Sequence, residues 1–114
     1  MQNQFRVEVR RDGRAALIVV SGELDLASGP ELEAELLQIV SPETERLVID
    51  LRALDFMDST GLSILLQAHQ RLSAEGVEMG LVRGSAQVQR LLDLTGVSER
   101  LTLVDLPGEM LDGH

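Results

Sequence analysis

The sequence predicts an α/β fold in which a mixed β-sheet is covered mainly on one face by helices. Two observations support this prediction. Apolar runs typical of buried strands alternate with segments of helical apolar spacing. The resulting order of strand, strand, helix, strand, helix, strand, helix, strand contains βαβ units, whose strands run parallel. Because 114 residues suit one compact domain, we expect a single domain over 1–114, with a poorly patterned tail at 105–114.

The first two strands are predicted to form a hairpin. Residues 5–10 alternate apolar and charged side chains, which is typical of a strand with one solvated face. The pair Asp12-Gly13 favours a tight turn. Residues 15–20 are apolar throughout, which indicates a strand covered on both faces. We expect 21–26 to form a loop.

A helix and a short buried strand follow. Ser28 precedes Pro30 and Glu31 at the spacing of a capping box, so we expect Ser28 to cap a helix that ends near residue 40. The apolar run at 47–51 predicts the next strand, which completes a βαβ unit.

The second half of the chain continues the alternation of helix and strand. The pattern predicts a helix at 59–75 ended by Gly76, a strand at 77–82, a helix from a Ser85 cap to Gly96, and a strand at 101–104.

The composition narrows the class of function. A net charge of -9 and a pI near 4.5 disfavour binding to nucleic acid or to an anionic membrane. All basic residues are Arg and Cys is absent, so lysine-dependent phosphate loops, Schiff bases, thiolate nucleophiles and Cys-ligated metals are excluded. We therefore expect protein partners and no cofactor. Because no apolar run approaches the length of a membrane span, we also expect a cytoplasmic location.

The junction between the third strand and the second helix carries the main functional signal. Asp58, Ser59, Thr60 and Gly61 stand where the first N–H groups of a helix lack partners and the helix dipole is positive. In the simplest interpretation Asp58 is an N-cap, which contributes about 1 kcal/mol. A functional interpretation is that the helix presents an exposed Ser59 hydroxyl.

The topology is expected to place a second acidic loop beside this junction. Glu23 and Asp25 follow the second strand, and functional loops gather at the carboxyl ends of parallel strands. Asp25 and Asp58 should therefore lie close together. Asp25 either contacts an arginine of a partner or bonds the local backbone.

Catalysis by these residues is disfavoured. A hydrolase could use Asp25 and Asp58 as a carboxylate pair, but the chain has no Trp or Tyr to hold a sugar. His69 lies about 15 Å along the helix from Ser59, too far for a catalytic triad. We therefore expect no enzyme. Without an internal base Ser59 is a better phosphoacceptor than nucleophile, because a kinase supplies the base.

Four segments together resemble the STAS domain family, and most closely its single-domain anti-sigma factor antagonists. They are residues 22–25, 47–51, 56–62 with the Asp-Ser-Thr-Gly motif, and 91–96. The resemblance implies that the unphosphorylated protein binds an anti-sigma factor that is also a serine kinase, and so releases a sigma factor. Phosphorylation would reverse this, and a metal-dependent serine phosphatase would restore the active form.

The resemblance also implies roles for individual residues. Ser59 matches the phosphoacceptor, and Thr60 is a second candidate. The expected partner-binding residues are Glu23, Asp25, Asp58, Thr60 and Gly61. Other members of the family point to an alternative, a constitutive adaptor or scaffold subunit of a stressosome or lipid-transport complex. Direct nucleotide binding would have only the helix N-terminus to hold phosphate, since no Lys or Gly-rich loop is present.

Overall fold

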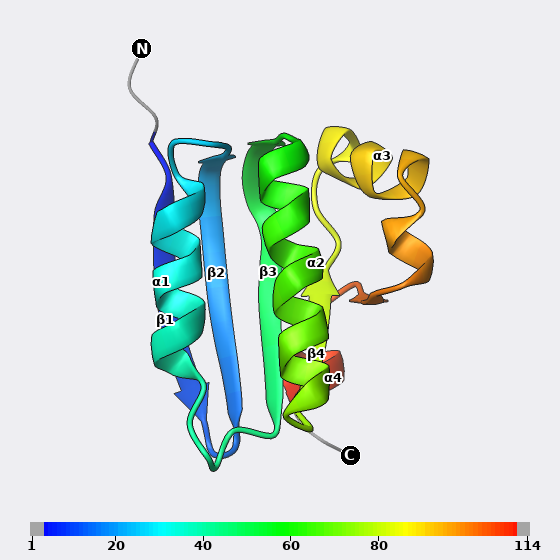
Figure 1. Cartoon of the computed structure of the whole chain (residues 1–114). Helices are drawn as coiled ribbons and strands as arrows, with labels where there is room; N and C mark the ends of the chain where they lie inside the picture. The colour runs from blue at the N-terminus through cyan, green and yellow to red at the C-terminus, as the bar shows by residue number, and fades with distance from the viewer. Residues whose placement is uncertain (1–3, 112–114) are drawn as a thin grey trace.

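The computed structural model describes residues 4–111, which form a five-stranded mixed sheet in the order β1-β2-β3-β4-β5 (Figure 1). β1 runs antiparallel to β2, and the other neighbouring strands are parallel. The predicted fold class is therefore confirmed. The strands are β1 (Arg6–Asp12), β2 (Ala15–Leu24), β3 (Arg46–Met57), β4 (Glu78–Val82) and β5 (Thr102–Val104).

The helices lie mainly on one face of the sheet. α1 and α2 run side by side across that face in Figure 1, and α3 contributes Val88 and Leu92 to the same core. Of the helices within residues 4–111, the short α4 alone packs against the opposite face, where Met110 contacts Val48 and Val82. The helices are α1 (Gly29–Ile39), α2 (Ser59–Ala74), α3 (Ala86–Leu94), the 3-10 helix η1 (Val97–Glu99) and α4 (Gly108–Leu111).

The predicted ends of the second and third helices are confirmed. Gly76 and Gly96 follow α2 and α3 with φ of 78° and 77°, the left-handed conformation that only glycine adopts without strain. At the start of α3 the Ser85 hydroxyl accepts a bond of 3.4 Å from the Val88 N–H. These helix ends could be predicted from the sequence because each depends on one residue and its near neighbours.

The predicted loop at 21–26 is wrong over its first part. Residues 21–24 belong to β2, and β3 extends six residues beyond the predicted end at 51, to Met57. In this extension Glu23 pairs with Phe56 and Leu24 pairs with Met57, after two register shifts in the pairing of β2 with β3. The pairing is between segments far apart in sequence, so the local pattern of polar residues did not reveal it.

Ser28 is the N-cap residue of α1, as predicted, but its side chain forms no capping hydrogen bond. Ser28 is buried with helical φ and ψ, and its hydroxyl donates a bond of 2.7 Å to the Glu23 carbonyl oxygen. Asp25 stabilises the turn that precedes the cap, because its Oδ1 accepts from the N–H groups of Ala27 at 3.0 Å and Ser28 at 3.1 Å. The turn before α1 therefore starts three residues earlier than predicted.

The tail folds back onto the sheet. The tail, predicted only as poorly patterned, contains one helical turn, α4, which begins where Glu109 Oε2 accepts the backbone N–H groups of Asp105 and Leu106. Met110 then packs over Gly80 of β4. The first three and last three residues of the predicted 1–114 domain lie outside the described residues. None of the described helices is long and apolar enough to cross a lipid bilayer.

Candidate functional site

The loops that follow β2 and β3 lie side by side at one end of the sheet. Leu24 and Met57 are paired in the sheet, and the Asp58 N–H donates a bond of 3.2 Å to the Leu24 carbonyl oxygen. The predicted proximity of the Asp25 and Asp58 loops is therefore confirmed. Parallel pairing of the two strands is its cause.

Asp58 is the N-cap of α2. Its Oδ1 accepts hydrogen bonds from the Thr60 N–H at 2.9 Å and from the Gly61 N–H at 3.1 Å. Its carbonyl oxygen accepts from the Leu62 N–H at 3.1 Å, the first bond of the helix. The capping interpretation is confirmed, and it gives the residue between Asp58 and Thr60 a fixed position.

That residue is Ser59, the first residue of α2, and it is exposed to solvent. Among residues 4–111 no group forms a hydrogen bond with the Ser59 hydroxyl. The site therefore presents an accessible hydroxyl on a helix of 16 residues whose N-terminus is held by the cap.

Ser59 borders a groove of about 430 Å³ between α1 and α2. Leu26 of the loop before α1 is 75% exposed and borders this groove. A smaller hollow continues the groove toward Leu37, which is 64% exposed. The groove is lined by Leu26, Pro30, Glu33, Ser59, Thr60, Ser63, Ile64 and Gln67. The hydroxyl is thus surrounded by a partly apolar surface.

Gly61 holds the start of α2 close to the sheet. A Cβ at this buried position would lie 2.8 Å from Leu24 Cγ and 2.8 Å from Met57 Cγ. Its hydrogen atom leaves room for both side chains, so Gly61 acts through packing. Thr60 is half-buried and faces the groove.

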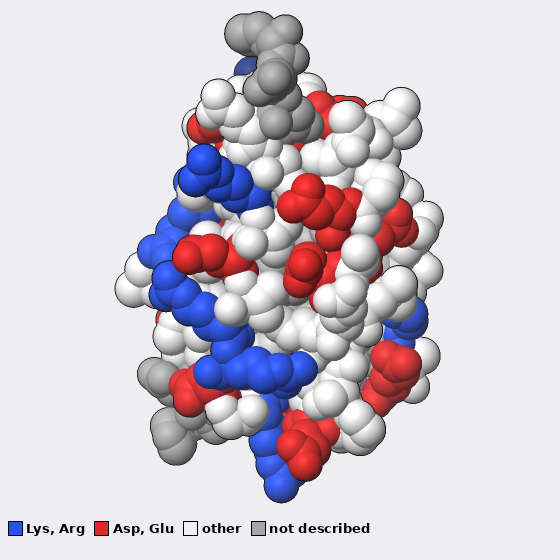
Figure 2. Space-filling model, turned by 90° about the vertical axis from the view of Figure 1, so that its left-hand side faces the viewer, with Lys and Arg blue, Asp and Glu red and all other residues white. Residues whose placement is uncertain are grey.

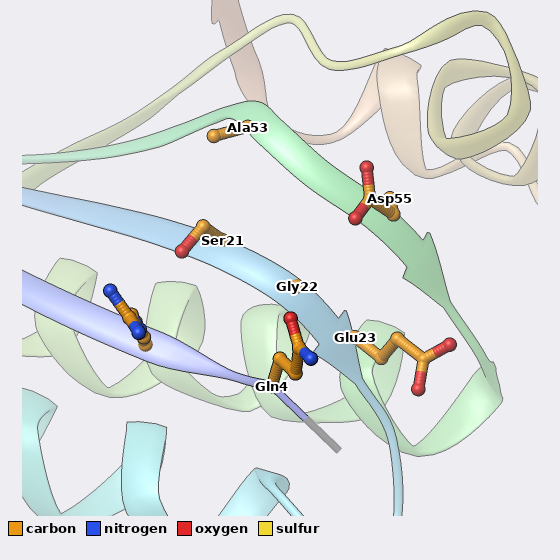
Figure 3. A pocket seen from close by; sticks show the side chains of 7 residues that line it. Gln4, Ser21, Gly22, Glu23, Ala53 and Asp55 are labelled. Atoms are coloured by element: carbon orange, nitrogen blue, oxygen red, sulfur yellow. The ribbon is translucent and has the colours of Figure 1, made fainter. Parts of the chain in front are cut away.

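The predicted acidic residues do not all face this groove. Asp25 is half-buried and its Oδ1 bonds the local backbone, one of the two alternatives predicted for it. Glu23 is exposed and borders a different hollow of about 520 Å³, shared with Arg6 of β1 and Asp55 of β3 (Figure 3). Asp25 and Asp58 each use a carboxylate oxygen to hold backbone N–H groups. Both carboxylates therefore have a structural role, which gives no support to the alternative in which Asp25 and Asp58 act as a catalytic carboxylate pair.

One buried charge was not singled out from the sequence. Asp50 of β3 is 3% exposed and forms an ion pair with Arg52, with Oδ2 and Nη2 2.8 Å apart. Burial raises the pKa of Asp50, but the side-chain and backbone hydrogen bonds and the charge of Arg52 outweigh burial and hold the pKa below its ordinary value. An aspartate within an apolar strand, two residues before an arginine, is the signal that could have revealed this pair.

Comparison with known proteins agrees with this architecture. The profile of the STAS domain family matches residues 6–108. The chain belongs to the STAS domain family. It is 32% identical over 105 residues to the anti-sigma-B factor antagonist of Listeria monocytogenes, covering 91% of this chain and 92% of that protein. It is 29% identical to the anti-sigma-F factor antagonist RsfB of Mycobacterium tuberculosis, covering 97% and 90%.

Solved structures are similar over nearly the whole domain. An anti-sigma factor antagonist from Mycobacterium paratuberculosis superimposes with a TM-score of 0.86 at 29% identity, covering 96% of this chain and 92% of that one. Unphosphorylated SpoIIAA, also an anti-sigma factor antagonist, superimposes with a TM-score of 0.74 over 95% and 93% of the two chains. At 21% identity the SpoIIAA likeness supports the fold alone.

Proposed function

We propose that this STAS domain is an anti-sigma factor antagonist controlled by phosphorylation at Ser59. In its unphosphorylated form it binds an anti-sigma factor that is also a serine kinase, and a sigma factor is released. The observation that carries the proposal is the exposed Ser59 hydroxyl, fixed by the Asp58 cap beside a partly apolar groove. The names of the relatives supply the class of partner.

The position of Ser59 suits a kinase substrate. A kinase needs an exposed hydroxyl in a defined place and provides the base and the metal itself. A phosphate would add a charge of about -1.5 to -2 near the positive end of the α2 dipole, so we expect the helix to remain folded.

The same position explains how the phosphate would release a partner. Leu26 and Ile64 border the groove beside Ser59, so a bound protein would cover the serine with apolar surface. Covering a phosphate in this way removes its water, which is costly without paired cations. The carboxylate of Asp58, the adjacent residue, adds repulsion. Phosphorylation would therefore weaken binding without unfolding the domain.

Other residues are assigned supporting roles in this proposal. Thr60 lies on the surface of this domain that binds the partner. Asp25 and Asp58 hold the backbone of the two loops at that surface, and Gly61 lets the start of α2 lie close to the sheet. Glu23 would meet only a partner that also reaches the neighbouring hollow. A metal-dependent serine phosphatase would reverse the modification, and all these partners would be cytoplasmic.

Affinity capture with paired baits tests the proposal. The wild type and Ser59→Asp are compared with Ser73→Asp, an exposed serine in the last turn of the same helix. We expect mass spectrometry to identify a GHKL-type serine kinase with the wild type and the Ser73→Asp bait, and its loss with Ser59→Asp. The recovered kinase and ATP should then phosphorylate the wild type and Ser63→Ala, but not Ser59→Ala.

Two outcomes would contradict the proposal. Equal retention of scaffold or transport subunits by all three baits would indicate a constitutive adaptor. Phosphate incorporation into Ser59→Ala at the wild-type level would place the modification elsewhere. Ser63 is a close control because it is exposed and lines the same groove.

A further inference from the structure

The outer edge of β1 is open. β1 is the first strand of the sheet, and within residues 4–111 no strand pairs with its outer side (Figure 1). Six of its seven residues are exposed, including the apolar Val9 at 41%. An open strand of this length is a template for pairing with another chain.

The hairpin determines which backbone groups face outward. The closing pair of a two-residue hairpin, here Asp12 with Ala15, exchanges both backbone hydrogen bonds, and bonded pairs alternate along an antiparallel ladder. Arg6, Glu8 and Arg10 therefore bond β2 as Asp12 does. The N–H and C=O groups of the residues between them, at 7, 9 and 11, point to the open edge.

The charges of β1 are complementary to those of a second, antiparallel β1. When Val9 faces Val9 of the copy, Glu8 faces Arg10 and Arg6 faces Asp12, and symmetry repeats both pairs. These four opposite-charge pairs would lie on one face of the joined sheet, because directly opposite residues share a face. They occupy non-hydrogen-bonded positions, where opposite side chains come closest.

Neighbouring registers lose this match. Centring the pairing on Glu8 places it opposite its own copy and places Arg6 opposite Arg10. Centring it on Arg10 places Glu8 opposite Asp12. Figure 2 views this edge of the molecule and shows a stripe of arginines with acidic side chains beside it. Centring the pairing on Val7 or Arg11 keeps only one kind of opposite-charge pair, so the Val9 register is the one that pairs all four charged residues of this face.

We propose that β1 is a self-association edge, through which two copies pair antiparallel about Val9 to form one continuous sheet. The arrangement is isologous, so it closes as a dimer. It leaves Ser59 accessible, because that residue follows β3, two strands away from the edge. The proposal therefore does not depend on the phosphorylation proposed above.

Several terms oppose this dimer and make it weak. Each copy carries a net charge of -9, and α1, which bears exposed glutamates, lies over β1 in Figure 1. Glu8 and Arg10 already form an exposed ion pair within the monomer, with Oε2 and Nη2 3.5 Å apart, and exposed ion pairs each contribute little. Association therefore depends on the backbone bonds and on the correct register. It is expected as a concentration-dependent equilibrium.

Sedimentation equilibrium of the full chain from micromolar to millimolar concentration tests the register. Glu8→Arg places like charges opposite each other in two symmetric pairs, and should weaken the dimer about tenfold. The double variant Glu8→Arg/Arg10→Glu restores every opposite-charge pair and should recover wild-type association. Recovery by the double variant would distinguish this register from nonspecific attraction.

A second pair of variants tests the backbone bonds. Val9→Pro removes an N–H that points outward and is not used within the monomer, so the fold should survive while the dimer is lost. Val9→Thr keeps the N–H and should still associate, and far-ultraviolet circular dichroism checks that both variants are folded. A wild type that stays monomeric at millimolar concentration would overturn the proposal. So would a dimer that persists in folded Val9→Pro.

Discussion

Replacing Asp58 by alanine is expected to destabilise the domain through the start of α2. The change removes the acceptor of the Thr60 and Gly61 N–H groups and leaves both donors without their partner. Loss of an N-cap side chain costs about 0.5 to 2 kcal/mol. Because Asp58 satisfies two donors and is charged near the positive end of the helix, we expect a loss of about 1 to 2 kcal/mol. For a domain of this size, that corresponds to a fall in Tm of about 4 to 8 °C.

Urea unfolding followed by circular dichroism measures this loss. Fluorescence is unsuitable because the chain has no Trp or Tyr. Asp58→Asn keeps an acceptor oxygen and should lose about half as much free energy. Ser59→Ala should stay within about 0.5 kcal/mol of the wild type, because its hydroxyl bonds nothing in residues 4–111. Equal losses in Asp58→Ala and Ser59→Ala would refute the assignment of separate capping and presenting roles.

Two further stability predictions follow from the backbone and from the buried charge. Gly22→Ala should cost more than about 2 kcal/mol in denaturant unfolding, because φ is +88° and a Cβ would lie 2.6 Å from the Gln4 carbonyl oxygen. Gly76→Ala, with φ +78° and no atom within 4 Å, isolates the conformational part and should cost about 1 kcal/mol; equal losses would exclude a role for the Gln4 contact. In the folded wild type the pKa of Asp50 is lowered, and this lowering stabilises the domain. The stabilisation is fully present above the pKa of Asp50 in the unfolded chain, about 3.9, and it is lost as pH falls through the folded pKa. Arg52→Gln leaves burial dominant and raises the pKa of Asp50, so the variant should lose more stability at pH ~7 than at pH ~4; the opposite order in urea midpoints would contradict this account.

The elements that the sequence predicted well depend on residues close to one another along the chain. The 59–75 helix was recognised from its apolar stripe, Asp58 and Gly76. The hairpin at Asp12-Gly13 likewise depends on local backbone preferences. Such signals act over one or two turns of chain, so they can be read before any tertiary contact is known.

The ends of β2 and β3 required tertiary information. Residues 21–24 contain a glycine and a glutamate, which locally favour a loop. They form a strand because residues 53–57 pair beside them and bury Leu24 and Met57. The Ser28 hydroxyl bonds the Glu23 carbonyl oxygen at the end of β2, so it does not cap the first N–H groups of α1.

The candidate site also has features that the sequence predicts and features that depend on tertiary contacts. By itself the sequence determined an α/β domain with an Asp-Ser-Thr-Gly helix start and no lysine or cysteine chemistry, because composition and local periodicity fix these properties. Only the tertiary structure decided that Ser59 borders a groove with Leu26, that Glu23 borders a different hollow, and that Gly61 packs against the side chains of Leu24 and Met57. Those relations depend on the register between β2 and β3, and register is set by side chains that meet only when the sheet forms.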